Sequence, residues 1–392
     1  MTSKTRARKV LLVINSLEGG GAERMMCTLA SALAEGEEHW AVTLVTLDRG
    51  EGMYAPSSHV SRTPLESGGR LLPSIHVLLR VMQDIRPDVV VSFLTRANCA
   101  AIACSRLLRI PCIISERVHT TSHFSSGGLR GLRKLAVRCF YPYADRVIAV
   151  SRGVGDDLVR NYGLATSQIV TIHNTIEIDR IVQSARAEPS IVLPADYIVA
   201  VGRLVANKNF SMLLRSYARA NIASALMILG EGPERSRLTA LAAALGIADR
   251  VHLPGFVPNP HAIVARARFY VSSSNAEGFP NAMLEAMCVR QPVVATDCDS
   301  GPAEILHGEE SGPRALTLTR APFGILVPTD DEHAMSAALR LMEDPETRAR
   351  FAVAAWRRAH QFDPGDSICR YKAVINAVVP IAAFRRQPAE SL

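Results

Sequence analysis

Short apolar runs alternate with helix-like segments along the whole chain. Each run is rich in Val, Ile and Leu and lacks the polar alternation of a half-exposed strand, which is typical of strands covered on both faces. Between them, segments such as 24–36 carry apolar residues at helical spacing. This alternation predicts βαβ units and a parallel sheet. In the first half the predicted strands are 9–17, 40–47, 87–94, 111–116 and 145–151.

The second half repeats the pattern after a proline-containing stretch with little periodicity at 185–196. A chain of 392 residues also exceeds the usual size of one core. We therefore predict an α/β fold of two Rossmann-like, doubly wound parallel-sheet domains facing across a cleft: residues 1–186 and 187–365, with a C-terminal helix at about 366–386 that packs back on the first. The predicted strands of the second domain are 197–204, 225–232, 250–256, 267–274, 291–297 and 323–328.

Composition places the chain among ordinary globular proteins, with 48% hydrophobic and 21% charged residues. Its eight cysteines form no CxxC pair and no metal-like spacing with histidine, which favours buried thiols in a reducing compartment. The apolar run near the N-terminus is short and leads into glycines, and the run at 373–384 contains a proline. We expect a cytoplasmic protein, or one attached to a membrane from the cytosolic side.

A glycine-rich segment, EGGGAER at 18–24, follows the first predicted strand and opens a helix. Gly19, Gly20 and Gly21 leave room for a ligand to approach the backbone, and a helix N-terminus favours anions. The segment fits neither the GxGxxG pattern nor a P-loop. A plain tight turn is the alternative interpretation.

Two further segments follow predicted strands of the second domain. In VGRLVANKN (201–209), Arg203 and Lys208 bracket a loop, a pair of cations that suits a diphosphate unless the loop is merely solvated. In EGFPNAMLEAM (277–287), Pro280 suits a helix start, where the N–H groups of Asn281 and Ala282 are free. Its two glutamates, Glu277 and Glu285, are good acceptors for sugar hydroxyls. One exposed glutamate and one favourable charge near a helix N-terminus is the simpler reading.

Taken together and in order, the glycine-rich loop, GRLVANKN, GEGPE, VHLPGFVPN and EGFPNAMLEAM resemble the retaining glycosyltransferases of family 4, which have the GT-B fold. The resemblance extends from GGGAER to GILVPTDD, and its most specific part is the pair of glutamates beside the Arg/Lys loop. Segments 149–159 and 172–179 also look like cleft-facing segments of that family.

The resemblance implies a role for each matching residue. Arg203 and Lys208 would bind the donor diphosphate with the amides of Gly20 and Gly21, and Glu285 would bind the ribose. Glu277 would hold the donor sugar with the backbone near Phe279. The full donor-binding set is Gly20, Gly21, Arg203, Lys208, Glu231, Phe256, Gly278, Phe279, Pro280, Asn281 and Glu285.

The resemblance also implies a catalytic set and a mechanism. His119 would touch the transferred sugar, which makes Glu277, His119, Arg203 and Lys208 the catalytic candidates; a solvated loop histidine is the alternative for His119. Glu116 would help to recognise sugar or acceptor, as would Arg117. The family retains configuration by a same-face substitution in which the departing phosphate takes the acceptor proton. The protein then supplies positioning and charge stabilisation.

Two features depart from the family pattern. Ser300-Gly301 replaces the more usual Gly-Gly, which puts the donor sugar identity in doubt. The adjoining Asp297-Cys298-Asp299 is a D-x-D string, which carries a divalent metal in another glycosyltransferase fold. Because it follows a late strand of the second domain, we interpret Asp297 and Asp299 as loop caps. We expect no metal and no cofactor.

A basic segment explains part of the net charge of +7. Within 127–140, Leu129, Leu132, Leu135, Ala136 and Cys139 share one helical face, and Arg130, Arg133, Lys134 and Arg138 lie largely on another. A basic amphipathic helix suits an anionic membrane surface. The alternative is a surface helix whose apolar face packs on its own domain. Aromatic residues are not interleaved with the basic ones, which argues against nucleic acid.

These observations predict an enzyme that moves a sugar from a nucleotide-sugar, UDP-hexose or UDP-N-acetylhexosamine, to a lipid-linked, surface-polysaccharide or lipopolysaccharide acceptor. We expect it at the inner face of the cytoplasmic membrane. A GDP-mannose-dependent mannosyltransferase, a nucleotide-sugar epimerase and a non-catalytic sugar-nucleotide-binding protein are the alternatives. The sequence predicts no oligomeric state.

Overall fold

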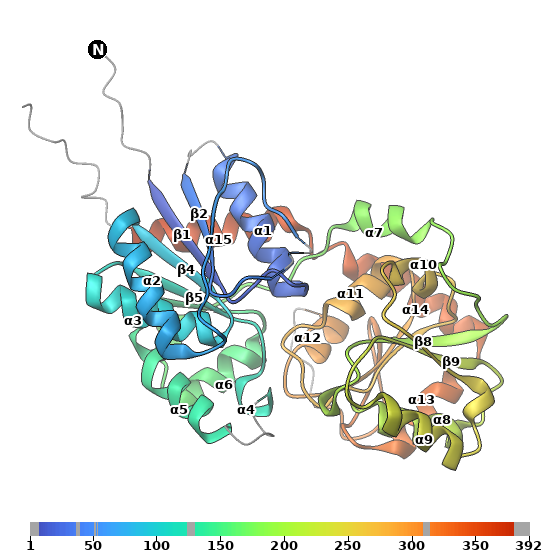
Figure 1. The fold of residues 1–392 in the computed structure, drawn as a ribbon. Coiled ribbons are helices and arrows are strands. Elements are labelled where there is room, and N and C mark those ends of the chain that lie inside the picture. Colours follow the sequence, from blue (N-terminus) through green and yellow to red (C-terminus); the bar gives the residue numbers. More distant parts are fainter. Residues whose placement is uncertain are drawn as a thin grey trace, which may run out of the picture.

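Two seven-stranded sheets organise the computed structural model, which describes residues 8–36, 40–50, 52, 54–123, 130–308 and 314–379 (Figure 1). The first sheet is parallel throughout and has the order β3-β2-β1-β4-β5-β6-β7. Its strands are β1 (Lys9–Ile14), β2 (Ala41–Thr46), β3 (Ser61–Pro64), β4 (Val89–Phe93), β5 (Cys112–Glu116), β6 (Arg146–Ala149) and β7 (Ile169–Thr171).

Helices cover both faces of this sheet, which explains its continuous apolar strands. One face packs against α1 and α15, and the other against α2, α3, α5 and α6. The helices of this half are α1 (Gly21–Ala34), α2 (Leu71–Ile85), α3 (Thr95–Leu108), α4 (Thr120–His123), α5 (Arg130–Phe140), α6 (Arg152–Tyr162), α7 (Ile178–Ala185) and the 3₁₀ turns η1 (Tyr141–Tyr143) and η2 (Thr166–Gln168).

The second sheet has the order β10-β9-β8-β11-β12-β14-β13, and within it β13 alone pairs antiparallel. Its strands are β8 (Tyr197–Val201), β9 (Ala225–Leu229), β10 (Val251–Gly255), β11 (Tyr270–Ser272), β12 (Val293–Thr296), β13 (Thr319–Ala321) and β14 (Gly324–Val327). Its helices are α8 (Phe210–Ala220), α9 (Arg235–Ala244), α10 (Pro260–Val264), α11 (Asn281–Cys288), α12 (Pro302–His307), α13 (Glu332–Leu341), α14 (Pro345–Ala359), η3 (Ala206–Lys208) and η4 (Ala248–Arg250).

The last helix, α15 (Pro364–Val378), returns to the first half and lies beside α1 (Figure 1). Its Tyr371 is fully buried, with its ring 5.9 Å from that of Phe93. The part of the predicted C-terminal helix beyond residue 379 lies outside the described residues. The boundary at 186/187 falls between α7 and β8 and stays a proposal.

The predicted fold class is confirmed, and each predicted strand coincides with an observed one. Three observed strands, β3, β7 and β13, were not predicted, and each lies at an edge of its sheet. In both sheets the strand order reverses beside the first strand: between β1 and β4, and between β8 and β11. Loops at the carboxyl ends of strands around such a reversal form ligand-binding crevices.

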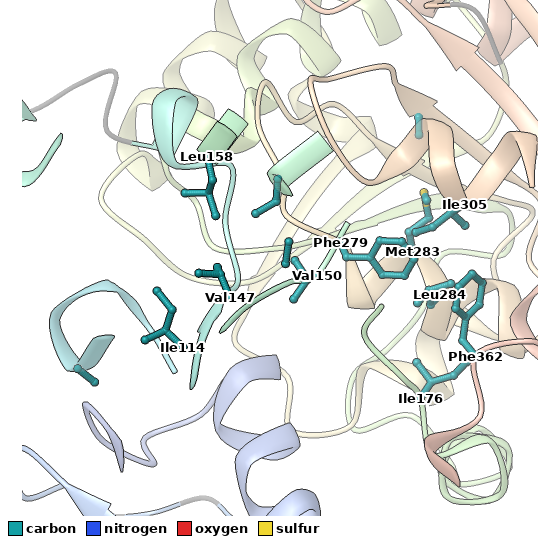
Figure 2. Close-up of a cluster of buried hydrophobic side chains, with 14 of the residues drawn as sticks. Ile114, Val147, Val150, Leu158, Ile176, Phe279, Met283, Leu284, Ile305 and Phe362 are labelled. Atoms are coloured by element: carbon teal, nitrogen blue, oxygen red, sulfur yellow. The ribbon is translucent and has the colours of Figure 1, made fainter. Parts of the chain in front are cut away.

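The two halves share one hydrophobic cluster (Figure 2). Val150 and Leu158 of the first half belong to the same cluster as Phe279 and Met283 of the second. Apolar packing therefore holds the two sets of loops together at the site described below.

Candidate active site

The loops after β8 and β11 bring two of the predicted residues into contact. Lys208 ends η3, and its Nζ donates to Glu277 Oε1 at 2.5 Å. The two side chains are 25% and 13% exposed, so the pair is largely shielded from water. The loops are neighbours because β8 pairs with β11, although their residues are far apart in sequence.

Arg203, in the same loop as Lys208, is exposed. Its positive charge acts on α4 of the opposite half: burial, together with the charges of Arg203 and Arg133, lowers the pKa of His123. Arg203 therefore lies close enough to the first half for its charge to act there, and it shares a loop with Lys208.

Glu285 lies on α11, and it is paired across the crevice. Arg24 of α1 donates to its Oε1 at 2.9 Å, and His261 of α10 lies 3.4 Å from its Oε2. Burial alone would raise the pKa of Glu285, but the contacts with His261 and Arg24 lower it below its ordinary value. The carboxylate is thus ionised and already engaged by groups that a ribose hydroxyl would have to replace. Neither Arg24 nor His261 was predicted.

The segment 275–281 between these groups, called here the donor loop, is held by side chains along its backbone. Asn207 donates to the carbonyl of Ala276 at 2.8 Å, and Ser300 donates to that of Glu277 at 2.5 Å. Pro280 is the N-cap of α11, so it stands one position before the first helical residue, Asn281, and not in the first turn as predicted. The free N–H groups at the start of α11 follow directly.

Two glycines permit close approach of the two halves. A Cβ on Gly278 would lie 2.1 Å from the carbonyl oxygen of Arg117, and a Cβ on Gly21 would lie 1.9 Å from the side-chain Nδ2 of Asn281. The glycine-rich loop therefore packs directly on the donor loop. Gly20 precedes it as the N-cap of α1, without a side-chain cap.

His119 follows β5 and is buried, with 9% exposure. The Ser122 N–H donates to its Nδ1 at 3.3 Å, so in the neutral ring the proton is on Nε2. Nε2 lies 3.9 Å from Oδ1 of Asp157, a residue that also accepts from the Thr121 N–H at 3.0 Å. The ring is thus fixed as a donor on its Nε2 side, which is not the arrangement of a solvated loop histidine.

Glu116 and Arg117 are also buried, but their side chains point into the first half. Glu116 accepts from Tyr141 Oη and from the Arg117 N–H. These hydrogen bonds lower the pKa of Glu116, but burial outweighs them and raises the pKa to about 7. Arg117 donates to Tyr371 Oη at 3.2 Å and lies over the ring of Phe93. These contacts favour a supporting role beneath the site; direct acceptor recognition stays a prediction.

Two of the predicted donor-binding residues, Phe256 and Glu231, lie at the surface. Phe256 is 63% exposed. Glu231 is exposed and pairs with Arg235 at 2.6 Å, which lowers its pKa. Both are accessible to a ligand, and nothing in their surroundings fixes a role.

The D-x-D residues bind loops. Asp297 accepts from the Ala315 N–H at 2.6 Å, and burial raises its pKa. Asp299 accepts from Ser122 Oγ at 2.9 Å and lies 3.2 Å from Arg314. In the described part of the chain, no group of three or more His, Cys, Asp or Glu side chains is placed to hold a metal ion.

Helix α5 carries the predicted membrane residues. Leu132 is 63% exposed and Leu135 54%, whereas Val137 is buried. Arg133 and Arg138 are exposed and Lys134 is half-buried; Leu129 and the side chain of Arg130 lie outside what the structure describes. The alternative in which the apolar face packs on its own domain is therefore wrong for these two leucines. Among the described helices, none is long and apolar enough to cross a membrane.

Comparison with known families gives the site its context. Residues 19–180 match the model described as Glycosyltransferase Family 4, and residues 182–358 match Glycosyl transferases group 1. The chain is a family 4 glycosyltransferase. Its two Rossmann-like halves form the GT-B fold, and Arg203, Lys208 and Glu277 of this glycosyltransferase follow β8 and β11, at the strand reversal of the second sheet.

Individual relatives cover almost the whole glycosyltransferase. A Campylobacter jejuni N-acetylgalactosamine-N,N'-diacetylbacillosaminyl-diphospho-undecaprenol 4-alpha-N-acetylgalactosaminyltransferase is 29% identical over 91% of this chain and 96% of its own. The amylovoran biosynthesis glycosyltransferase AmsD of Erwinia amylovora is 25% identical over 94% and 99%. Among solved structures, Anabaena Alr3699/HepE in complex with UDP superposes with a TM-score of 0.70 at 18% identity, over 94% of this chain and 100% of that one.

The glycosyltransferase site also contains residues that sequence reasoning missed. Arg24 adjoins the glycine-rich loop, and Asn174 lies within the segment 172–179 that resembles cleft-facing sequence. Ser300 was noted only as a departure from the family pattern. Their contacts cross between loops that are distant in sequence, so no local spacing marks them.

Proposed function

We propose that this glycosyltransferase moves a hexose or N-acetylhexosamine, with retention of configuration, from a UDP-sugar to a lipid-linked or surface-polysaccharide acceptor. One observation carries the proposal: Lys208 pairs with Glu277, which brings the loop that holds Arg203 and Lys208 against the segment that holds Glu277 and Glu285. Cations suit a diphosphate, and carboxylates accept from sugar hydroxyls.

The chemistry follows from these positions. Arg203 and Lys208 stabilise the charge that develops on the leaving diphosphate, and Glu277 holds sugar hydroxyls. His119 Nδ1 accepts from the Ser122 N–H, so the ring proton is on Nε2. From Nε2, His119 donates a hydrogen bond to the transferred sugar. The C–O bond to the leaving phosphate breaks as the acceptor oxygen attacks the same face, and the acceptor proton passes to that phosphate. No protein carboxylate is needed as a nucleophile.

The sugar and acceptor classes are supported by the relatives. The Campylobacter jejuni enzyme is named for N-acetylgalactosaminyl transfer to a diphospho-undecaprenol glycan, and the Erwinia amylovora enzyme for polysaccharide biosynthesis. The nucleotide UDP is favoured by the Anabaena complex, whose fold this chain shares.

The surface of α5 supports attachment to an anionic membrane. Exposed Leu132 and Leu135 would enter the headgroup region while Arg133, Lys134 and Arg138 contact anionic lipid, each cation contributing about 1 kcal/mol. Since Arg133 also influences His123 at the crevice, an acceptor anchored in that membrane would reach the site. We place the enzyme on the inner face of the cytoplasmic membrane.

Transfer is proposed to be independent of metal ions, because the cations at the crevice suffice for the diphosphate and both aspartates of the D-x-D string already bind loop groups. Three other functions are distinguished by the experiment below. A GDP-mannose-dependent mannosyltransferase would use the same residues with another base, and an epimerase or a non-catalytic binding protein would bind nucleotide without moving sugar to lipid.

The experiment uses purified protein with a panel of UDP- and GDP-sugars, bacterial membrane lipid, and buffer with or without EDTA. Nucleotide release and labelled lipid are measured. We expect UDP release with lipid labelling, unchanged by EDTA, and losses of at least ~100-fold in Lys208→Ala and Glu285→Ala. Glu332→Ala, which breaks the remote pair with Arg215, is the matched control. GDP release would favour the mannosyltransferase; activity abolished by EDTA and restored by manganese would refute metal independence.

A further inference from the structure

The donor loop receives contacts from the far side of the interdomain linker. Asn174 follows β7, before α7, and its side-chain amide donates to the carbonyl of Phe279 at 2.9 Å and to Asn281 Oδ1 at 2.8 Å. The Asn207 and Ser300 contacts come from the second half itself. Asn174 is therefore a point where the end of the first half sets the shape of the loop.

The neighbouring residue grips the same part of the loop. The His173 ring stacks on Phe279, with centroids 4.6 Å apart and planes 9° apart, and meets Phe362 edge-on. Phe279 and Phe362 belong to the cluster that spans both halves (Figure 2). Residues 173 and 174 thus hold the ring and the carbonyl of one loop residue.

A carboxylate lies beside His173. Glu304 of α12 lies 3.4 Å from His173 Nε2 and accepts from the N–H groups of Arg152 and Gly153, at 2.8 and 3.0 Å, where α6 begins. Burial alone would raise the pKa of Glu304, but these contacts lower it below its ordinary value. The grip on the donor loop is thereby tied to contacts that exist only while the two halves are together.

The environment of Asn174 does not favour the stability of the folded state. It is 7% exposed, and its Oδ1 is buried without a hydrogen-bond partner among the described residues. A buried acceptor without a hydrogen bond destabilises the folded state. Two donated bonds to the donor loop are the evident compensation, which points to the loop as the reason for this residue.

We propose that Asn174 is a positioning residue: it orients the donor loop so that the backbone N–H groups near Phe279 and Asn281 meet the donor sugar, and His173 fixes the ring beside it. The inference rests on the proposed function, since it assigns the loop to the sugar. Neither side chain touches the reacting atoms. Their effect is on loop geometry, where a displacement of about 1 Å is enough to lower the rate by ~100-fold.

The test compares Asn174→Ala with Gln168→Ala. Gln168 also donates two bonds from a side-chain amide to backbone carbonyls, of Pro142 and Ala144, but within the first half. We expect kcat/KM for the UDP-sugar to fall at least ~10-fold in Asn174→Ala and to stay within twofold in Gln168→Ala. The affinity for UDP alone, by calorimetry, should stay within about threefold, because UDP lacks the sugar. Asn174→Ser, which leaves a hydroxyl in place, is the milder variant if the alanine protein does not fold.

His173 supplies an independent arm. His173→Phe keeps the stacking and should retain transfer within about fivefold, whereas His173→Ala should lose it as Asn174→Ala does. Wild-type protein that transfers no sugar would overturn the proposed function. Active wild-type protein with kcat/KM unchanged in Asn174→Ala, or with UDP affinity lost in parallel with kcat/KM, would overturn the positioning role alone.

Discussion

Removing the Lys208–Glu277 pair separates its structural role from its chemical one. Two unit charges about 4 Å apart attract by about 4 kcal/mol at an effective dielectric constant of about 20. Desolvation offsets most of this, and the side chains stay 25% and 13% exposed. We therefore expect each single variant, Lys208→Ala and Glu277→Gln, to lose about 1–2 kcal/mol of unfolding free energy. Because the double variant leaves no unpaired charge, it should recover part of that loss.

Activity should behave differently from stability. In the proposed mechanism Lys208 stabilises the leaving diphosphate by about 3 kcal/mol, so we expect Lys208→Ala to lower kcat/KM by at least ~100-fold. The double variant should be no more active than the worse single variant. The assays are urea unfolding and UDP release with lipid labelling. Arg237→Ala and Glu234→Gln, which break an exposed pair at 2.6 Å, serve as controls and should change stability by less than ~0.5 kcal/mol. Activity that returns with stability in the double variant would refute the assignment.

Three further predictions concern other parts of the molecule. Burial raises the pKa of Glu116 from 4.5 to about 7, so this residue destabilises the fold increasingly as pH rises from about 4.5 to 7. Glu116→Gln should therefore raise Tm at pH 8 and have little effect on Tm at pH 4, and equal Tm shifts at both pH values would contradict the burial argument. Ser300→Gly removes the hydrogen bond from Ser300 to the donor loop, so kcat should fall about 3–10-fold with Tm nearly unchanged. Transfer rates equal to those of the wild-type protein across a panel of donor sugars would contradict this expectation. Leu132→Glu with Leu135→Glu should abolish co-sedimentation with anionic vesicles without lowering Tm, and retained binding would exclude α5 as the contact.

The fold was largely readable from the sequence because burial on both faces imposes continuous apolar strands. The missed strands show the limit of that signal. β3 is the polar segment SRTP, mostly exposed, and β7 has three half-buried residues. β13 contains an exposed arginine and pairs antiparallel. Edge strands are covered less, so their sequences need no apolar pattern.

Residues of the candidate site could be proposed from the sequence where they lie close together along the chain. The spacing of Arg203 and Lys208, and of Glu277 and Glu285, lies within single loop–helix segments, and the structure brings these segments together. Arg24 was missed because its partner is 261 residues away. Such contacts depend on how the two halves pack, and one sequence does not contain that information in any short pattern.

A crystal structure of the protein with an intact UDP-sugar would show where the donor binds. We expect the diphosphate within hydrogen-bond distance of Arg203 and Lys208, the ribose on Glu285 in place of Arg24, and the sugar between Glu277 and His119. A donor bound away from the loops after β8 and β11, with the Lys208–Glu277 and Arg24–Glu285 pairs intact, would contradict this expectation.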